Sequence, residues 1–363
     1  MNTRDVNIYD DAAMEAFRKE GRFDPELLRT FRNRLFKKFV SNDDASRVLP
    51  NSADLKLHSL ELFQRKDSEL DGATKLLFRT DANLLIESVI LRITPSESAG
   101  QQGPGSRRST VCVSSQVGCA AACDFCATGK MGIARNLSAA EILDQVVQTG
   151  QILATEDRRL NNIVFMGMGE PFHNEQQLYE AITALTSPQK FDKSPRSILV
   201  STVGIPGAMV RFAKQFPNVN MALSLHSADQ AVRRQLIPLA EKHPLDELKD
   251  ALKAVNAIRD EPVMIEYLML HELNDSAEDA DQLVNWLRDV NTRVNLIPYN
   301  AIDESPHLVA SSPEVISAFS SRLKSAGIET TTRYSLGRDI AAACGQLVRK
   351  SQPGASRRSK TRT

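Results

Sequence analysis

A loop of three closely spaced cysteines constrains this chain more than any other feature. Cys119, Cys123 and Cys126 are separated by three and then two residues, and Phe125 precedes the last of them. Three thiolates in one short loop can bind three irons of a cube-shaped [4Fe–4S] cluster and leave the fourth iron open for a substrate. The same cysteines could instead supply three of four zinc ligands, or pack as small hydrophobic side chains. Zinc is the poorer alternative because no nearby Cys–His pair completes a tetrahedron.

The composition is that of a globular protein from a reducing compartment. The 363 residues are enough for one large domain, or for a large and a small one, and 42% of them are hydrophobic. Five cysteines, an odd number, argue against a disulfide framework. The polar N-terminus and the lack of an apolar run of about 18 residues indicate a cytoplasmic protein without a membrane span. The 45 basic residues balance 45 acidic ones, so RNA binding would require local patches.

Four segments are expected along the chain. Residues 1–75 form a helical accessory domain, and residues 76–105 form a β-hairpin followed by a polar, Gly- and Pro-rich linker. Residues 106–350 form the main domain. The last residues, 351–363, are rich in Ser, Arg and Lys and are expected to be a disordered basic tail.

The accessory domain contains one clear amphipathic helix. Asp24 followed by Pro25 is a helix start, and apolar residues then recur at helical spacing as far as Phe39. The opposite face is basic and consists of Arg29, Arg32, Arg34, Lys37 and Lys38. This face is either an ordinary solvated surface or a patch that binds RNA phosphates.

Two β-rich runs, 74–79 and 84–94, are joined by turn-forming residues and predict the hairpin. Glu87 lies inside the second run, which is otherwise apolar. An unpaired carboxylate would be costly to bury there. The residue therefore either points to solvent or has a functional role.

After the cysteine loop, strand and helix patterns alternate along the chain. A capping box at Ser138 and Glu141 opens a helix, and further helical patterns cover 245–258 and 277–288. Short apolar runs lie at 110–113, 163–166, 198–201, 219–225, 263–270 and 294–298. About six β/α units of this kind predict an α/β fold, a parallel sheet curled into a full or partial TIM-like barrel. A further helix–strand pair is expected at 313–324 and 330–334.

Polar and glycine residues follow several of the expected strands, where the loops of such barrels carry the chemistry. The segment Met-Gly-Met-Gly-Glu-Pro ends one strand with Gly169 and Glu170, and the glycines allow close approach of a ligand. Ser201, the Ser224-Leu225-His226 segment and Asn300 end later strands. Each is a weak signal by itself, because polar residues commonly end strands. Their recurrence on successive units indicates one ligand site.

These stretches together resemble the RlmN/Cfr family of radical S-adenosylmethionine (SAM) RNA methyltransferases, which methylate ring carbons of adenosine. The cysteine spacing, with an aromatic residue before the last cysteine, is similar to the loop of radical SAM enzymes in general. The family match adds the segments Cys-Val-Ser-Ser-Gln-Val-Gly-Cys at 112–119, Asn-Leu-Ile-Pro-Tyr-Asn at 295–300 and Ala-Ala-Cys-Gly-Gln-Leu at 342–347. The resemblance runs from about 84 to 348, whereas residues 1–75 match poorly.

The resemblance implies a role for each matching position. Cys119, Cys123 and Cys126 would hold a [4Fe–4S] cluster. SAM would be bound by Gly169, Glu170, Ser201, Ser224, Leu225, His226 and Asn300. Cys344 would carry a methyl group from a first SAM, and a radical made from a second SAM would activate it for addition to the adenine ring. Cys112 would then release the product through a transient disulfide with Cys344, and Glu87 would accept the displaced ring proton.

The implied activity is methylation of carbon 2 of an adenosine in 23S rRNA near the peptidyl transferase centre, with a tRNA anticodon loop as a second family substrate. The alternative in the same family is carbon 8, which is linked to antibiotic resistance. A flavodoxin is the expected electron donor, and the protein is expected to be a monomer. Two other hypotheses stay open. One is a radical SAM enzyme that consumes SAM without methyl transfer, and the other is a metal-stapled RNA-binding protein without catalysis.

Overall fold

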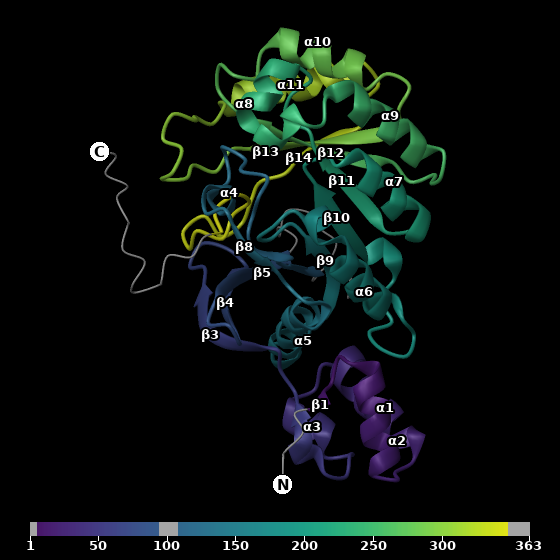
Figure 1. The fold of residues 1–363 in the computed structure, drawn as a ribbon. Helices are drawn as coiled ribbons and strands as arrows, with labels where there is room; N and C mark the ends of the chain where they lie inside the picture. The colour runs from purple at the N-terminus through teal and green to yellow at the C-terminus, as the bar shows by residue number, and fades with distance from the viewer. Residues whose placement is uncertain (1–5, 94–107, 348–363) are drawn as a thin grey trace, which may run out of the picture.

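The computed structural model describes residues 6–93 and 108–347, and it contains an α/β fold built on one large sheet (Figure 1). The predicted linker and the basic tail at 351–363 lie outside the described residues. The sheet has ten strands in the order β14-β13-β12-β11-β10-β9-β6-β5-β4-β3. Within the described residues, no helix is both long and apolar enough to span a membrane.

The strands from β6 to β14 in this sheet run parallel to one another. Their bounds are β6 (Arg108–Cys112), β9 (Leu160–Phe165), β10 (Ile198–Thr202), β11 (Asn220–Ser224), β12 (Val263–Met269), β13 (Thr292–Pro298) and β14 (Thr330–Thr332). Each predicted apolar run therefore forms a strand. On its other side β6 pairs antiparallel with β5, and β14 and β3 form the two open edges of the sheet. The curved sheet is therefore a partial barrel, as predicted.

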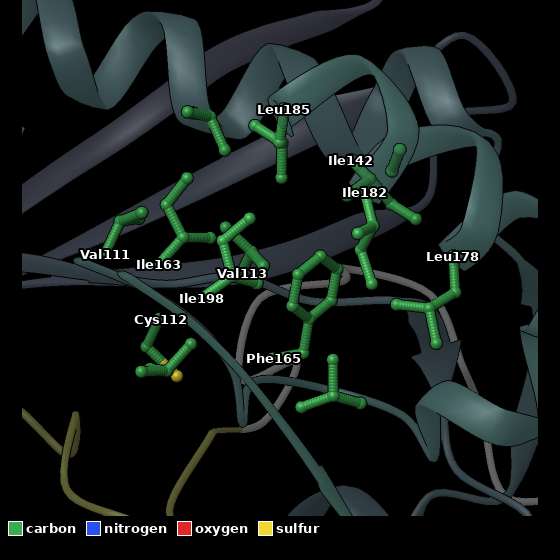
Figure 2. Packing of buried hydrophobic residues seen from close by; sticks show 14 of the residues in the cluster. Val111, Cys112, Val113, Ile142, Ile163, Phe165, Leu178, Ile182, Leu185 and Ile198 are labelled. Atoms are coloured by element: carbon green, nitrogen blue, oxygen red, sulfur yellow. The ribbon is translucent and has the colours of Figure 1, made fainter. Parts of the chain in front are cut away.

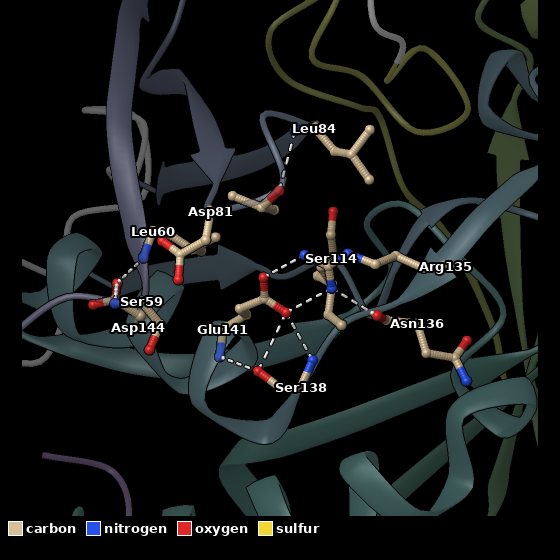
Figure 3. Close-up of polar contacts among 12 residues, drawn as sticks. Ser59, Leu60, Asp81, Leu84, Ser114, Arg135, Asn136, Ser138, Glu141 and Asp144 are labelled. Atoms are coloured by element: carbon tan, nitrogen blue, oxygen red, sulfur yellow. Dashed lines mark hydrogen bonds and ion pairs between the residues drawn. The ribbon is translucent and has the colours of Figure 1, made fainter. Parts of the chain in front are cut away.

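Helices connect these parallel strands and run along the outer side of the curved sheet (Figure 1). They are α5 (Ala139–Thr155), α6 (Glu175–Thr186), α7 (Pro206–Gln215), α8 (Gln230–Leu236), α9 (Leu245–Asn256), α10 (Ala277–Trp286) and α11 (Pro313–Ser325). Short 3-10 turns η4 (Pro171–Asn174), η5 (Pro195–Ser197) and η6 (Pro238–Glu241) precede or follow them. The capping box predicted at Ser138 and Glu141 is present at the start of α5 (Figure 3).

The predicted hairpin is formed by β4 (Ala73–Thr80) and β5 (Leu85–Ile93), which pair antiparallel. A third strand, β3 (Leu60–Asp67), pairs with β4 and forms the edge of the sheet. This strand corrects the helical assignment of residues 1–75, because the last element of the helical part is η2 (Ser52–Asp54). The strand pattern was missed because only Leu60 of β3 is buried, so no apolar alternation marks it.

The N-terminal module, residues 6–58, lies at one end of the molecule beside α5 (Figure 1). It consists of β1 (Val6–Asn7), α1 (Asp11–Glu20), α2 (Pro25–Arg32), the π-helical turn η1 (Asn33–Lys37), α3 (Asn42–Ser46), η2 and β2 (Leu55–Lys56). Several cations of its basic face are paired with acids. Arg29 contacts Glu26, Arg32 contacts Asp11 and Lys37 contacts Asp192. These pairs favour the solvated surface over a phosphate-binding patch.

A buried carboxylate on α5 fastens the N-terminal module to the core. Asp144 accepts hydrogen bonds from the Tyr9 hydroxyl and from Nδ1 of His58, at 2.8 and 2.9 Å. It also accepts from the backbone N–H groups of Ser59 and Leu60, both at 2.8 Å (Figure 3). The module is thus held in place by polar contacts as well as by apolar packing.

The main hydrophobic core lies between the parallel strands and the helices. Val111 and Val113 point toward α5 and α6, whereas the intervening Cys112 points to the other side of its strand (Figure 2). Side chains alternate in this way along any strand. The sequence therefore buries the valines in the core and directs Cys112 toward the inner face of the sheet, where the candidate site lies.

Candidate active site

The cysteine loop follows β7 (Gln116–Gly118), which pairs with β8 (Ile133–Asn136), and leads into the short helix α4 (Ala127–Lys130). Its backbone folds back on itself: a Cβ on Gly129 would lie 2.8 Å from the Cys123 nitrogen, so only glycine fits there. Cys119 and Cys123 are buried, and Cys126 is partly buried. The fold of the loop thus brings the three thiols out of bulk solvent together.

Asp124 anchors the loop between its second and third cysteines. Its backbone N–H donates to the Leu236 carbonyl at 2.9 Å, and its carboxylate contacts Lys130 and Nε2 of His307. The Ser305 hydroxyl donates to the Asp124 carbonyl at 2.5 Å. These contacts fix the loop against two segments distant in sequence, so the positions of its thiols do not depend on a ligand alone.

The three cysteines face a cavity at the carboxyl ends of the parallel strands, here called the cysteine-loop cavity. Besides Cys119, Cys123 and Cys126, its lining includes the predicted positions Gly169, Glu170, Ser201, Ser224, His226 and Cys344. The strand ends β9, β10 and β11 therefore bring these polar residues to the face that holds the cysteine loop.

Glu170 is the buried carboxylate of this cavity. Its two oxygens accept hydrogen bonds from the backbone N–H groups of Phe172 at 3.0 Å and Val203 at 2.9 Å. Burial raises its pKa to about 7, although these two hydrogen bonds oppose the shift. A carboxylate held in a fixed orientation with little solvation is suited to accept hydrogen bonds from a ligand ammonium.

His226 lies in the left-handed region at φ 60° and is buried. Its Nδ1 accepts from the Leu268 N–H at 3.0 Å, so the neutral ring carries its proton on Nε2. Burial lowers its pKa to about 3, and the charge of Arg233 adds to this effect. The ring packs edge-on against Phe125 at 4.6 Å between centroids, which links the strand end to the cysteine loop.

Gly169 and the two serines complete the strand-end part of the cavity. Gly169 has φ 107°, and a Cβ there would lie 2.6 Å from the Cβ of Gln116, so the position requires glycine. The hydroxyls of Ser201 and Ser224 lie 3.4 Å apart on neighbouring strands. Both hydroxyls can donate or accept toward a polar ligand.

Two of the predicted SAM positions, Leu225 and Asn300, do not line the cysteine-loop cavity. Leu225 is fully buried in the main core and is not among the residues that line the cavity. Asn300 donates to the Ser335 hydroxyl at 3.0 Å and to the Cys344 carbonyl at 3.3 Å, and accepts from Nε of Arg338. In this structure Asn300 therefore holds the C-terminal segment that carries Cys344.

Cys344 is exposed and lies next to the cysteine loop, because the C-terminal segment docks on α4. The Ala127 N–H donates to the Gly345 carbonyl at 2.8 Å, and the Thr128 hydroxyl donates to the Leu347 carbonyl at 2.7 Å. In Figure 1 this yellow segment runs beside α4. The contacts place a thiol from the end of the chain at the edge of the cysteine-loop cavity.

Cys112 lines a second, larger cavity of about 460 Å³, here called the Cys112 cavity. Cys344 lines both cavities, together with Cys126, Met166, Gly167, Arg333 and Gly345. Burial raises the pKa of Cys112 to about 12. All five cysteines lie in the described ranges and are free, so the expected Cys112–Cys344 disulfide is not present in this structure.

Glu87 does not point to solvent. It is buried on β5 and forms an ion pair with Lys75 at 3.3 Å. Val89 pairs with Cys112 across the strands, and it lines the Cys112 cavity with Leu91. Because side chains alternate, Glu87 shares the strand face of Val89 and Leu91 and lies one step beyond the lining of this cavity.

Two charged residues of the site were not found from the sequence. Glu266 on β12 lines the cysteine-loop cavity, and its Oε2 accepts from the Asn295 amide at 2.9 Å. Arg333, directly after β14, lines both cavities. Glu266 carries the same signal that singled out Glu87, a carboxylate inside an apolar run. Arg333 has no comparable local signal, because its importance comes from the tertiary fold.

The fold and the cysteine loop define a radical SAM enzyme, and residues 113–287 match the family model of the radical SAM superfamily. A probable RNA methyltransferase of Rhodopirellula baltica is 58% identical over 95% of this chain and 88% of its own. A dual-specificity RNA methyltransferase RlmN of Ruthia magnifica is 38% identical over 77% of this chain and 76% of its own. The crystal structure of a radical SAM methyltransferase from Sphaerobacter thermophilus superposes with a TM-score of 0.84 at 34% identity, covering 95% of this chain and 98% of that one.

The chain belongs to the RlmN/Cfr family of radical SAM RNA methyltransferases. It is thus a SAM-dependent enzyme that acts on RNA, and the family carries a [4Fe–4S] cluster. The predicted family and fold class are confirmed.

The residues present fit these cofactors. The three thiols line one cavity, as the corners of a cluster require, and each would lose its proton on binding iron. The described residues contain no group of three or more His, Cys, Asp or Glu side chains that could hold a single metal ion. Next to the thiols, Glu170, Ser201, Ser224 and His226 offer acceptors and donors for the polar groups of SAM.

Proposed function

We propose that this enzyme methylates carbon 2 of an adenosine in 23S rRNA, with tRNA as a second substrate, through a methyl group carried on Cys344. Several relatives are named dual-specificity RNA methyltransferases RlmN, which supports an RNA substrate and a second kind of RNA beside it. One observation carries the proposal: Cys344 is exposed and borders both the cysteine-loop cavity and the Cys112 cavity. A thiol there can take a methyl group on one side and deliver it on the other.

The cofactors would supply a 5′-deoxyadenosyl radical when bound, which is needed because the adenine carbons are too electron-poor to displace a methyl group from SAM. The residues of the chain hold and release the transferred carbon. Cys344 binds it covalently as a nucleophile. Cys112, which lines the Cys112 cavity together with Cys344, would attack the Cys344 sulfur and free the product.

Glu87 would accept the proton displaced from the adenine ring. It lies on the same strand face as the lining of the Cys112 cavity, and Lys75 holds its carboxylate. The Lys75 ammonium also donates to the Ala341 carbonyl at 3.2 Å, in the segment that leads to Cys344. This bridge ties the base to the methyl carrier. A flavodoxin-type protein as electron donor, a monomeric state and a cytoplasmic location complete the proposal.

The test uses anaerobically reconstituted protein, SAM with a labelled methyl group, and 23S rRNA and tRNA transcripts. Mass spectrometry of the digested RNA should show 2-methyladenosine. Formation of 8-methyladenosine would be compatible with the proposed mechanism but would show that carbon 8, and not carbon 2, is the methylated position. Formation of 5′-deoxyadenosine without methylation of either RNA would refute the substrate assignment.

The Cys344→Ala variant tests the carrier thiol. We expect methylated nucleoside to fall below detection, because no other thiol borders both cavities except the cluster ligand Cys126. An exchange of exposed Lys324 on α11 for Ala serves as the control and should leave product formation unchanged. Full formation of the methylated nucleoside by Cys344→Ala would instead show that the methyl group reaches the RNA without a methyl-cysteine intermediate.

A further inference from the structure

The side chain of Arg333 lies at the junction of the two cavities. Its backbone is fixed, since its N–H donates to the Leu296 carbonyl at 2.9 Å directly after β14. Its side chain lines the cysteine-loop cavity and the Cys112 cavity. Among residues 6–93 and 108–347, no hydrogen bond or ion pair reaches this guanidinium from another side chain.

Three ionisable groups line these cavities together with Arg333: Cys344 in both, Glu266 in the cysteine-loop cavity and Cys112 in the Cys112 cavity. Burial by itself would lower its pKa, but the anionic forms of Cys344, Glu266 and Cys112 outweigh burial and raise it. Glu266 does not close a salt bridge with it, and the Oε1 of Glu266 is buried without any hydrogen-bond partner in the described structure. The positive charge therefore remains available to the two sulfurs.

The other charged side chains that line the Cys112 cavity, Arg92 and Asp71, form hydrogen bonds with other residues. Arg92 donates two hydrogen bonds to Glu156, at 2.7 and 2.8 Å. Asp71 accepts from the backbone N–H groups of Ala73 and Gly337, at 2.9 and 2.8 Å. Within the described part of the chain, Arg333 is thus the cavity-lining cation with no partner of its own.

Cys112 needs such a cation for the role proposed above. A thiol attacks another sulfur only as its thiolate, and burial opposes that charge by raising the pKa of Cys112 to about 12. The nearby Cys344 acts in the same direction, and Arg333 is the side chain that acts against both. Without a facing cation, Cys112 would be an inert buried thiol.

We propose that Arg333 is a positioning residue that stabilises the Cys112 thiolate beside Cys344 and so enables product release. The inference rests on the proposed function. In this step the Cys112 thiolate forms a bond to the Cys344 sulfur, and the bond from that sulfur to the transferred carbon breaks. The electron pair stays on the carbon, which takes up a proton and becomes the product methyl group. An external dithiol then reduces the disulfide to the two starting thiols.

The experiment measures alkylation of Cys112 by iodoacetamide in the cluster-loaded full chain, at a series of pH values, with mass spectrometry of the Cys112 peptide. Arg333→Gln should slow alkylation by about three- to tenfold, because a facing charge shifts a pKa by 1–3 units and a more basic thiolate is intrinsically more reactive. Arg333→Lys keeps the charge and should restore the rate to within about twofold. Arg92→Gln, in the same cavity, is the matched control and should leave the rate unchanged.

An unchanged rate in a folded Arg333→Gln variant, judged by its urea denaturation midpoint, would overturn the proposal. If that variant does not fold, Glu266→Gln decides, because removal of the competing carboxylate should speed Cys112 alkylation. If Cys112 alkylation is no faster in Glu266→Gln than in the wild type, the proposal is wrong. This experiment measures the reactivity of Cys112 and does not depend on an RNA product. The role of Arg333 can therefore be refuted while RNA methylation is observed, and it can be supported even if the RNA substrate is a different one.

Discussion

Asp144 and Glu266 are both buried carboxylates on elements of the core, yet their surroundings differ completely. Asp144 accepts from the side chains of Tyr9, His58 and Gln148 and from two backbone N–H groups. Glu266 has one partner, the Asn295 amide, and its Oε1 has none among the described residues. A saturated carboxylate has nothing left to bind, whereas an unsaturated one retains the capacity to accept from a ligand.

The difference separates what holds the molecule together from what serves its chemistry. Two of the donors to Asp144, Tyr9 and His58, belong to the N-terminal module, and Ser59 and Leu60 directly follow it, so this carboxylate connects the module to α5. Glu266 lies instead in the cavity of the cysteine loop and faces Arg333. Stability should therefore depend strongly on the first carboxylate and weakly on the second.

The largest expected effect follows from replacing Asp144 with Ala. The exchange leaves five donors without their acceptor, and breaking such a buried network costs about 3–5 kcal/mol. We expect the free energy of unfolding, measured by urea denaturation, to fall by this amount. Replacement of the exposed Asp246 on α9 with Ala is the control, with a change of less than about 0.5 kcal/mol. A similar loss in both variants would contradict the role of Asp144 as a fastener.

A smaller loss is expected from Tyr9→Phe, which removes one donor and retains the aromatic packing against Phe36. One hydrogen bond to a charged group contributes about 1.5–3 kcal/mol, and the four remaining donors should reduce the loss toward the lower value. Urea denaturation of Tyr9→Phe, Asp144→Ala and the double variant tests this. Strictly additive losses would show that Tyr9 acts independently of Asp144.

Most of the fold was predictable because its strands are buried on both faces. The apolar runs at 163–166, 198–201 and 263–270 became β9, β10 and β12, since parallel strands carry nearly continuous hydrophobic residues. The edge strand β3 was not predictable in this way. Seven of its eight residues are exposed, so its sequence shows no burial pattern, and only the pairing with β4 makes it a strand.

The site was predictable where chemistry and chain order coincide. The cysteine loop and the strand-end residues Gly169 and Glu170 are local motifs, and the structure places them around one cavity. Arg333 joins them only because β14 lies parallel to β13 at the edge of the sheet. Asn300 was assigned to the ligand from its strand-end position, yet it holds the segment of Cys344. Such long-range contacts are set by the tertiary fold and leave no local pattern.

The smallest effect, and the sharpest test of the comparison, is expected from Glu266→Gln. Burial raises the pKa of Glu266 above its ordinary value of 4.5, although Arg333 and Asn295 oppose the shift. Well below pH 4.5 the Glu266 carboxyl is protonated in both the folded and the unfolded chain. There the unfolding free energies of the wild type and Glu266→Gln should differ by less than about 1 kcal/mol. As the pH rises above 4.5, the carboxyl loses its proton in the unfolded chain before it does so in the folded chain, and the wild type therefore loses stability. Gln cannot titrate and lacks this loss.

The unfolding free energy of the wild type should therefore fall relative to that of Glu266→Gln as the pH rises from about 4.5 toward neutrality. Urea denaturation of both proteins across this range gives the difference directly, and other titrating groups cancel because both proteins share them. A difference that stays constant, or that grows in favour of the wild type, would mean that the folded site already satisfies the Glu266 carboxylate. The contrast with Asp144 would then disappear, because both carboxylates would hold the fold and neither would be left to receive a ligand.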